Sequence, residues 1–127
     1  KDESKLTKII PKNKNIKIIK NEENIARLFS EQDLVISSSG ITAYELACLG
    51  IPSIFIPTDK YQLETAITME KNGFGMNCGF WDENFHNLDK KILMISKKSV
   101  RKKMYLSGRE IVDGNGLSRI VKKIYEF

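Results

Sequence analysis

Short apolar runs alternate with amphipathic stretches from residue 15 to the end of the chain. The runs are rich in Ile, Val, Leu and Phe and predict strands over residues 15–20, 33–37, 52–57 and, more weakly, 74–78. Between and after them, apolar residues recur at i, i+3 and i+4, as at Ile25, Leu28 and Phe29. This spacing predicts helices from residue 25 and over residues 42–49, 61–72, 85–96, 98–111 and 117–126.

The alternation of strands and helices predicts an α/β fold with a parallel sheet. Residues 33–37 are almost continuously apolar, which is typical of a strand buried on both faces. Right-handed crossovers would then place helices on both faces of a Rossmann-like sheet. Ligands of such folds bind at the carboxyl ends of the strands, where loops lead into helices. The candidate loops are therefore residues 21–24, 37–42 and 57–62.

The composition fits a single domain over residues 1–127. The chain has 127 residues, 41% of them hydrophobic, which is enough for a modest core. No apolar stretch approaches the ~20 residues that cross a bilayer and no secretory signal is visible, so we expect a cytoplasmic protein. Cys48 and Cys78 are expected to be reduced and mostly buried. Because the chain begins with Lys1 and not Met, we expect a fragment of a longer two-domain protein.

Charge is unevenly distributed along the chain. Residues 1–20 carry a net charge of +5, residues 21–86 carry −7 and residues 87–127 carry +7. The basic C-terminal third lacks interleaved aromatic residues, and its Lys and Arg fall between apolar positions at helical spacing. We therefore interpret it as solvated helix faces and expect no nucleic-acid partner. We therefore look for the functional site in the acidic segment over residues 21–86.

The loop over residues 37–42 joins a buried strand to a helix with three Ser, a Gly and a Thr. Its backbone N–H groups and the positive end of the helix suit an anion such as phosphate. The loop matches neither the Walker pattern nor G-x-G-x-x-G. Ser and Thr before a helix are also ordinary N-caps, so that alternative stays open.

Three polar residues near these loops are further candidates. Glu45 could direct its carboxylate to a vicinal diol such as that of ribose, or could be a solvated helix residue. Gln62 could reach the same crevice from the start of the next helix, or could simply be exposed. For Asp59 we favour N-capping or turn formation.

The sequence offers no set of catalytic or metal-binding residues. His86 is the only histidine and is interpreted as structural. No metal-ligand spacing and no Ser-His-Asp or Cys-His arrangement can be assembled. Phe80 and Trp81 are expected to pack in the fold and not to stack on a ligand.

The block over residues 33–57, followed by Gln62, resembles the C-terminal half of the GT-B nucleotide-sugar enzymes. The shared pattern is D-L-x-I followed by G-x-x-x-x-E-x-x-x-x-G-x-P. It is carried here by Asp33, Gly40, Glu45, Gly50 and Pro52. The chain looks most like the UDP-sugar hydrolases of pseudaminic acid biosynthesis, whose D-G-x-G-x-x-R ending is similar to residues 113–119. The transferase that forms lipid II is a more distant resemblance.

The resemblance implies a role for each candidate residue. The diphosphate would be held by Ser38, Ser39, Gly40, Ile41 and Thr42. Glu45 would bind the ribose hydroxyls, and Gln62 would contact the diphosphate or the sugar. The uracil would lie beside Glu22 and Glu23, and the sugar beside Asp59 and Tyr61. Tyr61 departs from the hydrolases, which tend to have Asn at this position.

The resemblance also implies that the catalytic base lies in an N-terminal half that this chain lacks. No catalytic residue, metal or cofactor is then expected in the chain, which would bind UDP or a UDP-sugar and turn over little. The leading interpretation is the UDP-binding domain of a UDP-sugar hydrolase in nonulosonic (pseudaminic) acid or surface polysaccharide biosynthesis. The alternatives are the donor-binding domain of a glycosyltransferase, whose lipid-linked acceptor would bring peripheral membrane contact, and a non-catalytic nucleotide or nucleic-acid binding module.

Overall fold

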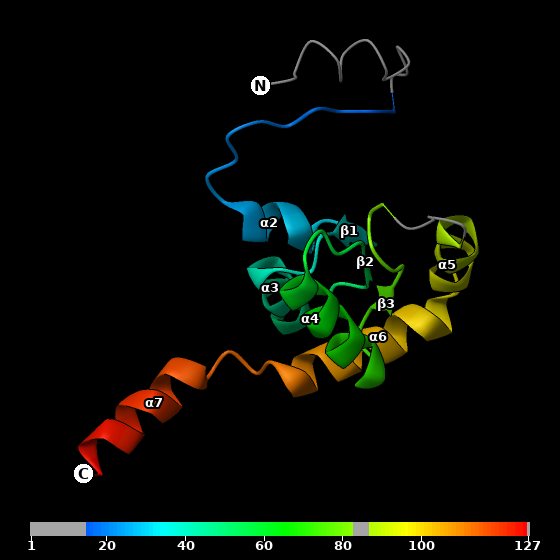
Figure 1. The fold of residues 1–127 in the computed structure, drawn as a ribbon. Coiled ribbons are helices and arrows are strands. Elements are labelled where there is room, and N and C mark those ends of the chain that lie inside the picture. Colours follow the sequence, from blue (N-terminus) through cyan, green and yellow to red (C-terminus); the bar gives the residue numbers. More distant parts are fainter. Residues whose placement is uncertain (1–14, 83–86, 127) are drawn as a thin grey trace.

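The computed structural model describes residues 15–82 and 87–126 (Figure 1). Short strands alternate with helices, as the hydrophobic pattern predicts. The elements in chain order are α2 (Ile25–Ser30), β1 (Val35–Ser37), α3 (Ile41–Leu49), β2 (Ser53–Phe55), α4 (Lys60–Lys71), β3 (Met76–Asn77), α5 (Leu88–Ile95), α6 (Lys98–Ile111) and α7 (Gly116–Tyr125). The segment from β1 to β3 is therefore two consecutive strand–helix–strand units.

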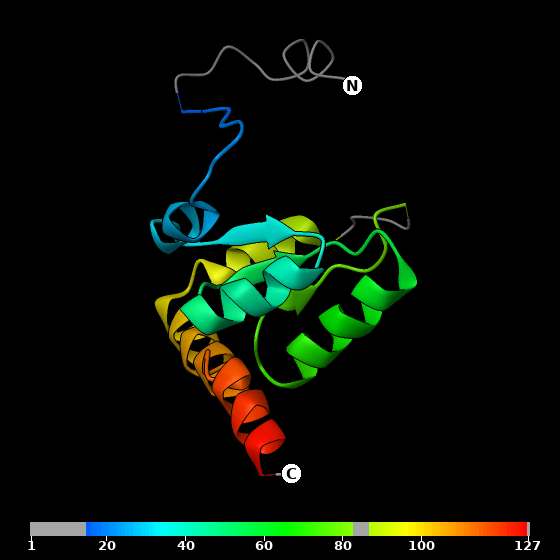
Figure 2. The ribbon, with the colours of Figure 1, turned by 90° about the vertical axis from the view of Figure 1, so that its left-hand side faces the viewer.

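The three strands form one parallel sheet in the order β1-β2-β3. Val35 of β1 is in register with Ser53 of β2, and Ile54 of β2 with Met76 of β3. Every residue of the central strand β2 is buried. The α/β class and the parallel sheet predicted from the sequence are confirmed. Because the strands are parallel, their carboxyl ends share one edge of the sheet (Figure 2).

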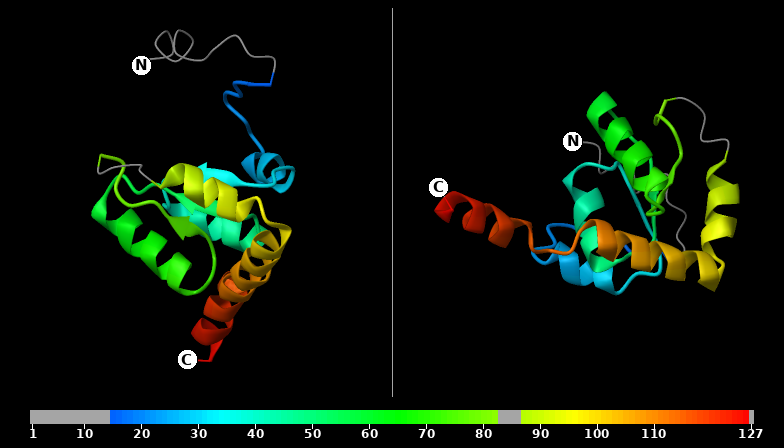
Figure 3. Two further views of the ribbon diagram at one scale, coloured as in Figure 1. Left: turned by 90° about the vertical axis from the view of Figure 1, so that its right-hand side faces the viewer. Right: turned by 90° about the horizontal axis from the view of Figure 1, so that it is seen from below.

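Helices cover both faces of the sheet. Figure 3 shows α3 on one side of the strands and α5 on the other. The core includes Leu46 of α3, Ile95 of α5 and the tilted ring pair Phe55–Phe74, whose centroids lie 6.1 Å apart. This packing fixes the strand ends and the helices that start from them.

Helix α6 packs closely against α3 because Gly108 has no side chain. A Cβ at Gly108 would lie 2.8 Å from the carbonyl oxygen of Ala47 and 2.7 Å from the ring of Phe74. Helix α3 itself ends at Gly50, which adopts the left-handed conformation at φ 72°. The sequence pattern predicts this helix end correctly.

The prediction of a strand over residues 15–20 is wrong. The chain there runs outside the sheet and away from the body of the fold before it reaches α2 (Figure 1). Ile16, Ile18 and Ile19 are between 41% and 48% exposed. In the described ranges β1 pairs only with β2, so its outer edge carries no further strand. The three Ile side chains therefore bury too little apolar surface to offset the conformational entropy of an ordered strand.

The strand predicted over residues 74–78 is shortened to Met76–Asn77. Gly75 at φ 78° and Gly79 at φ 79° adopt a conformation outside the β region on either side of it. The first residues of the helix predicted over residues 85–96 lie outside the described residues, and α5 begins at Leu88. In the ranges that the structure describes, no helix is both long and apolar enough to cross a membrane.

Candidate functional site

The loops that follow β1 and β2 lie at the carboxyl edge of the sheet. Residues 38–40 lead from β1 into α3, and residues 56–59 lead from β2 into α4. In Figure 2 the arrow of β1 points toward the loop from which α3 starts. This is the edge at which open α/β sheets bind their ligands.

Ser39 joins these two loops. Its side chain is fully buried, and its hydroxyl lies within hydrogen-bond distance of two backbone carbonyls, that of Ser38 at 2.5 Å and that of Gln62 at 2.8 Å. Its backbone adopts the left-handed conformation at φ 64°, which is uncommon for a residue with a side chain. Such strained positions cluster at functional sites. The structure thus brings two of the candidate residues, 23 positions apart in sequence, into direct contact.

The first turn of α3 is open to a ligand. Its N-cap is Gly40, and no side chain caps the helix. A Cβ at Gly40 would meet nothing within 4 Å, so the space over the turn is free. The first N–H groups of a helix have no partner within the helix and carry the positive end of its dipole. The alternative that the Ser and Thr of this loop act as ordinary N-caps is therefore not what the structure shows.

The side-chain oxygen of Gln62 is hydrogen-bonded to another residue of the chain. Its Oε1 accepts hydrogen bonds of 3.0 Å from both the backbone N–H and the hydroxyl of Thr58. The amide oxygen is therefore held, and the Nε2 group is the part of the side chain that can donate to a ligand. Asp59 caps α4, because its Oδ1 accepts from the backbone N–H of Gln62 at 2.9 Å. For Asp59 this confirms the capping interpretation.

Glu45 lies in the second turn of α3 and is exposed to solvent. The residue before it, Tyr44, is 50% exposed, and Tyr61 of α4 is 82% exposed. Both tyrosines line a surface hollow of about 310 Å³ between α3 and α4, whose other lining residues are Glu64, Thr65 and Thr68. This hollow therefore runs along α4 from its first turn and does not include Glu45.

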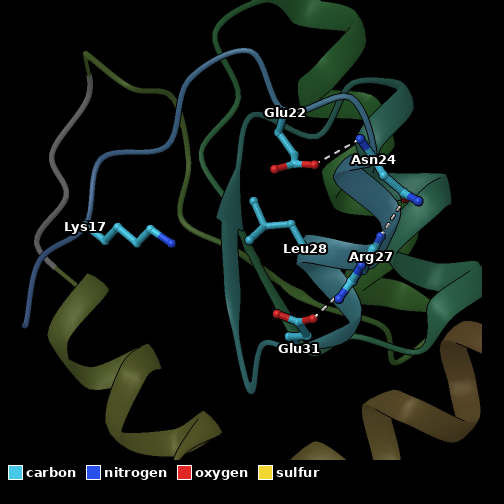
Figure 4. A pocket seen from close by; sticks show the side chains of 6 residues that line it. All are labelled: Lys17, Glu22, Asn24, Arg27, Leu28 and Glu31. Atoms are coloured by element: carbon cyan, nitrogen blue, oxygen red, sulfur yellow. Dashed lines mark hydrogen bonds and ion pairs between the residues drawn. The ribbon is translucent and has the colours of Figure 1, made fainter.

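Glu22 lines a different hollow, of about 250 Å³, whose lining residues are Lys17, Glu22, Asn24, Arg27, Leu28 and Glu31 (Figure 4). Its Oε1 accepts from the backbone N–H of Asn24, which in turn caps α2. In Figure 4 Arg27, Leu28 and Glu31 project from α2, with Arg27 paired to Glu31, and Lys17 lies across the hollow on the segment that precedes α2. None of these lining residues comes from the loops of Ser39 and Gln62, and Glu23 is exposed. The structure therefore does not join Glu22 and Glu23 to the other candidates.

Trp81 differs from the expectation that it packs in the fold. Its backbone N–H donates to the carbonyl of Pro57 at 3.1 Å, which holds the loop after β3 against the loop after β2. Its side chain is 54% exposed, whereas we expected it to pack; Phe80 is half-buried. Its position directly after the last strand was the signal that could have placed it at this edge.

The described residues contain no group of three or more His, Cys, Asp or Glu that could hold a metal ion. His86 lies outside the described residues. Cys48 and Cys78 are both free and half-buried. The pKa of the Cys78 thiol is raised, mainly because the thiol is partly buried. The charge of Lys91 lowers this pKa and the charge of Glu70 raises it, both by less than burial does. Such a thiol is less reactive than a free one.

The D-G-x-G-x-x-R segment forms a compact turn between α6 and α7. Asp113 accepts hydrogen bonds from the backbone N–H of Asn115 at 2.9 Å and from the Arg119 guanidinium at 2.6 Å. The hydrogen bond from Arg119 holds the pKa of the Asp113 carboxyl well below its usual range. In this structure the motif therefore links two helices.

Comparison with known families gives one match over most of the chain. The model of the glycosyltransferase family 28 C-terminal domain matches residues 1–115. The match includes β1, α3, β2 and α4, and it ends immediately before α7.

The chain is similar to two curated proteins and to several solved structures, one of which is described here. The spore coat polysaccharide biosynthesis protein SpsG of Bacillus subtilis (strain 168) is 29% identical over 124 residues, covering 92% of this chain and 36% of that protein. The uncharacterized protein MJ1062 of Methanocaldococcus jannaschii is 41% identical over 59 residues, covering 46% of this chain and 12% of that protein. The crystal structure of Acinetobacter baumannii MurG matches with a TM-score of 0.79 and 21% identity, covering 98% of this chain and 37% of that one. The chain thus spans little more than a third of SpsG and of MurG, and the MurG match supports the C-terminal half of a GT-B fold.

Proposed function

The chain belongs to the glycosyltransferase family 28 C-terminal domain family, and from that premise we propose that it is the nucleotide-sugar-binding domain of an enzyme of surface polysaccharide biosynthesis. The polysaccharide context is supported by the name of the SpsG relative. The nucleotide sugar is proposed to be a UDP-sugar. The cytoplasm is the proposed compartment.

One observation carries the proposal: the hydrogen bond from Ser39 to the backbone of Gln62. It places an uncapped helix start, with open space over Gly40, beside a side-chain amide whose oxygen is already held. Backbone N–H groups suit the charged diphosphate, and the Nε2 group of Gln62 suits a phosphate or sugar oxygen. No metal or cofactor is part of the proposal.

Each candidate residue has a place in this proposal. The diphosphate lies over residues 38–42, and Glu45 accepts hydrogen bonds from the ribose hydroxyls. The sugar lies toward Tyr61. The uracil lies on the side of Glu22 and Glu23, which the structure leaves apart from the other loops.

The proposed reaction breaks the bond between the anomeric carbon and the diphosphate oxygen. The bonding electron pair stays on UDP, so negative charge grows on the diphosphate. The N–H groups and the dipole of α3 would stabilise that charge as it develops. The described residues contain no metal cluster, and the base that activates the acceptor is proposed to lie on the remainder of the longer protein.

Water and a sugar or lipid hydroxyl are the two acceptors to be distinguished. We favour water, hence a hydrolase of nonulosonic (pseudaminic) acid biosynthesis, because residues 113–119 resemble the D-G-x-G-x-x-R ending of that group. Transfer to a hydroxyl is favoured by the family description and by the MurG fold match. Only a lipid-linked acceptor would require contact with a membrane.

The test is calorimetric titration of UDP into the chain, with CDP, GDP and UMP as comparators. The proposal predicts preference for UDP over GDP and UMP, and about tenfold weaker binding by Glu45→Ala, equivalent to ~1.4 kcal/mol. Glu110→Ala is the matched control, because this exposed glutamate lies on α6, away from the loops.

Equal affinity for UDP in the wild type and in Glu45→Ala would remove the ribose assignment. Absence of binding by all four nucleotides would contradict the proposed function itself. Salt-sensitive binding of an oligonucleotide with no UDP preference would instead support the nucleic-acid module. If UDP binds, assay of UDP release by the longer protein with and without an acceptor separates hydrolysis from transfer.

A further inference from the structure

Trp81 exposes its indole ring at the carboxyl edge of the sheet. The side chain is 54% exposed, although tryptophan is on average one of the more buried residue types. Trp81 lies in the loop after β3, as Ser39 and Thr58 lie in the loops after β1 and β2. The strand order β1-β2-β3 therefore places the Trp81 loop next to the Thr58 loop, on the side away from Ser39.

Backbone hydrogen bonds hold the Trp81 loop in place. The N–H of Cys78 donates to the carbonyl of Phe55 at 2.8 Å, and the N–H of Trp81 donates to the carbonyl of Pro57 at 3.1 Å. Gly79, at φ 79°, supplies the bend between these two contacts. Both contacts fix the backbone and involve no atom of the ring, so the indole is positioned and yet left exposed.

One peptide group links Trp81 to Gln62. The carbonyl of Pro57, which accepts from Trp81, belongs to the same peptide group as the N–H of Thr58. That N–H donates to the Oε1 atom of Gln62 at 3.0 Å. The backbone nitrogen of Trp81 therefore lies at most about 9 Å from this oxygen, given the lengths of the bonds in a peptide group. The two side chains thus start from neighbouring positions at the edge of the sheet.

An exposed indole beside a side-chain amide suits a sugar ring. A pyranose carries hydroxyl groups around its rim and C–H groups on its two faces. The Nε2 group of Gln62 can donate to the rim, because the amide oxygen is already held by Thr58. The ring of Trp81 offers a large apolar surface to a C–H face. A diphosphate has no apolar face, so the indole fits the sugar part of a nucleotide sugar and not its phosphates.

We propose that Trp81 is the stacking platform for the sugar ring of the nucleotide sugar. The proposal rests on the proposed function, in which the diphosphate lies over residues 38–42 and the sugar follows toward α4. Along the edge of the sheet the diphosphate then lies after β1, Gln62 after β2 and Trp81 after β3. Neighbouring strands are about 4.8 Å apart, which a pyranose ring can span. Trp81 therefore contributes to the affinity for a UDP-sugar and not to the affinity for UDP.

Fluorescence of the 127-residue chain tests this proposal, because Trp81 is its only tryptophan. Quenching of the indole by acrylamide is measured without ligand and at saturation with UDP, UDP-glucose or UDP-N-acetylglucosamine, and calorimetry gives the affinities. At least one of the two UDP-sugars should reduce the quenching by about half, because it covers one of the two ring faces. UDP should leave the quenching unchanged.

Variants of Trp81 give the second measurement. Trp81→Ala should weaken binding of that UDP-sugar by about tenfold and leave the affinity for UDP unchanged. Trp81→Phe keeps an aromatic face and should retain most of the affinity. Tyr125→Ala is the matched control, because it removes an aromatic side chain that is 85% exposed on α7, away from these loops. It should bind UDP and the UDP-sugar as the wild type does.

Three results would overturn the proposal and leave the proposed function intact. The first is binding of UDP with no change of quenching by either UDP-sugar. The second is equal protection of the indole by UDP and the UDP-sugars, which would place the ring on the nucleotide. The third is equal loss of UDP and UDP-sugar affinity in Trp81→Ala. If that variant does not fold, the quenching of the wild type decides. Absence of binding by UDP and both UDP-sugars would contradict the proposed function and this proposal with it.

Discussion

The hydroxyl of Ser39 donates to the backbone carbonyl of Gln62 over 2.8 Å, and this hydrogen bond joins the loop after β1 to the first turn of α4. Both groups are held within the protein before any ligand arrives. The helix start and the amide proposed to grip the diphosphate are therefore pre-organised, which lowers the entropic cost of binding.

Removal of this hydroxyl should weaken UDP binding as well as the fold. Ser39→Ala removes the side-chain hydrogen bond to the Gln62 carbonyl, at a cost of about 0.5–1.5 kcal/mol in the free energy of unfolding. Because the two loops are no longer tied, UDP affinity should fall by about tenfold. Thermal unfolding and calorimetry measure the two effects.

Ser53→Ala is the matched control for that experiment. Ser53 is also a fully buried serine, and its hydroxyl donates at 2.8 Å to a backbone carbonyl, that of Ile51. It lies at the start of β2, at the end of the strand opposite to the loops. It should lose similar stability and keep its UDP affinity. Equal loss of UDP affinity in both variants would show that binding depends on overall stability and not on the hydrogen bond between Ser39 and Gln62.

Gly40→Ala should weaken binding without loss of stability. Gly40 adopts φ −75° and ψ −144°, and the added methyl group would meet no protein atom within 4 Å, so the substitution creates no steric overlap. That methyl group would occupy the space through which a phosphate approaches the helix start. Unchanged melting temperature with about tenfold weaker UDP binding is the expected pair of results. Unchanged affinity would move the diphosphate away from this turn.

Gly108→Ala should lower the stability of the fold and leave UDP binding nearly unchanged. The added methyl group would lie within 2.8 Å of the Ala47 carbonyl oxygen, which cannot move without shifting α3. Overpacking of this kind costs about 1–3 kcal/mol, so the melting temperature should fall by several degrees. Nucleotide affinity, measured well below the melting temperature, should change little. An unchanged melting temperature would mean that α3 and α6 separate easily.

Local pattern predicted most of the fold, because the information lies within short segments. The block from Asp33 to Pro57 gave a strand, a helix that ends at Gly50 and a second strand, and each is found near its predicted position. The strand over residues 15–20 failed because a strand also needs a neighbour to pair with, and a local pattern does not reveal whether one is present.

The positions of the candidate residues in the fold were predictable from the sequence, but the contacts between them were not. Sequence reasoning placed Ser39, Gly40 and Gln62 at one edge of the sheet. The hydrogen bond between Ser39 and Gln62 depends on how two loops pack, and the pairing of Gln62 with Thr58 depends on a side-chain rotamer. Trp81 was assigned to packing because an aromatic residue is usually buried, whereas its loop holds it at the rim.

The pKa of the Cys78 thiol should respond to its two charged neighbours in opposite directions. Burial is the largest cause of its raised pKa, Lys91 lowers it and Glu70 raises it. Lys91→Ala should therefore raise the pKa further, and Glu70→Gln should lower it. The measurement is the pH dependence of iodoacetamide alkylation in a Cys48→Ser background. Shifts of the same sign in both variants would contradict the assignment of these neighbours.

The carboxyl group of Asp113 should titrate at unusually low pH, because the Arg119 guanidinium donates to it at 2.6 Å. A carboxyl group whose pKa is lower in the folded than in the unfolded state stabilises the fold above the unfolded value of about 3.9. That contribution begins to be lost when the pH falls below about 4, and it is fully lost once the pH is below the lowered pKa of the folded state.

Arg119→Gln should return the pKa of Asp113 toward its usual range, which carboxyl-carbon NMR titration measures directly. The same variant should increase hydrogen exchange at the Asn115 amide, whose acceptor is Asp113. The reason is that Asp113 is no longer held in place by its hydrogen bond from Arg119. Lys122→Gln, which removes a cation from the same helix without touching the carboxyl, should leave both measurements unchanged. A normal pKa for Asp113 in the wild type would mean that the ion pair between Asp113 and Arg119 does not persist in solution.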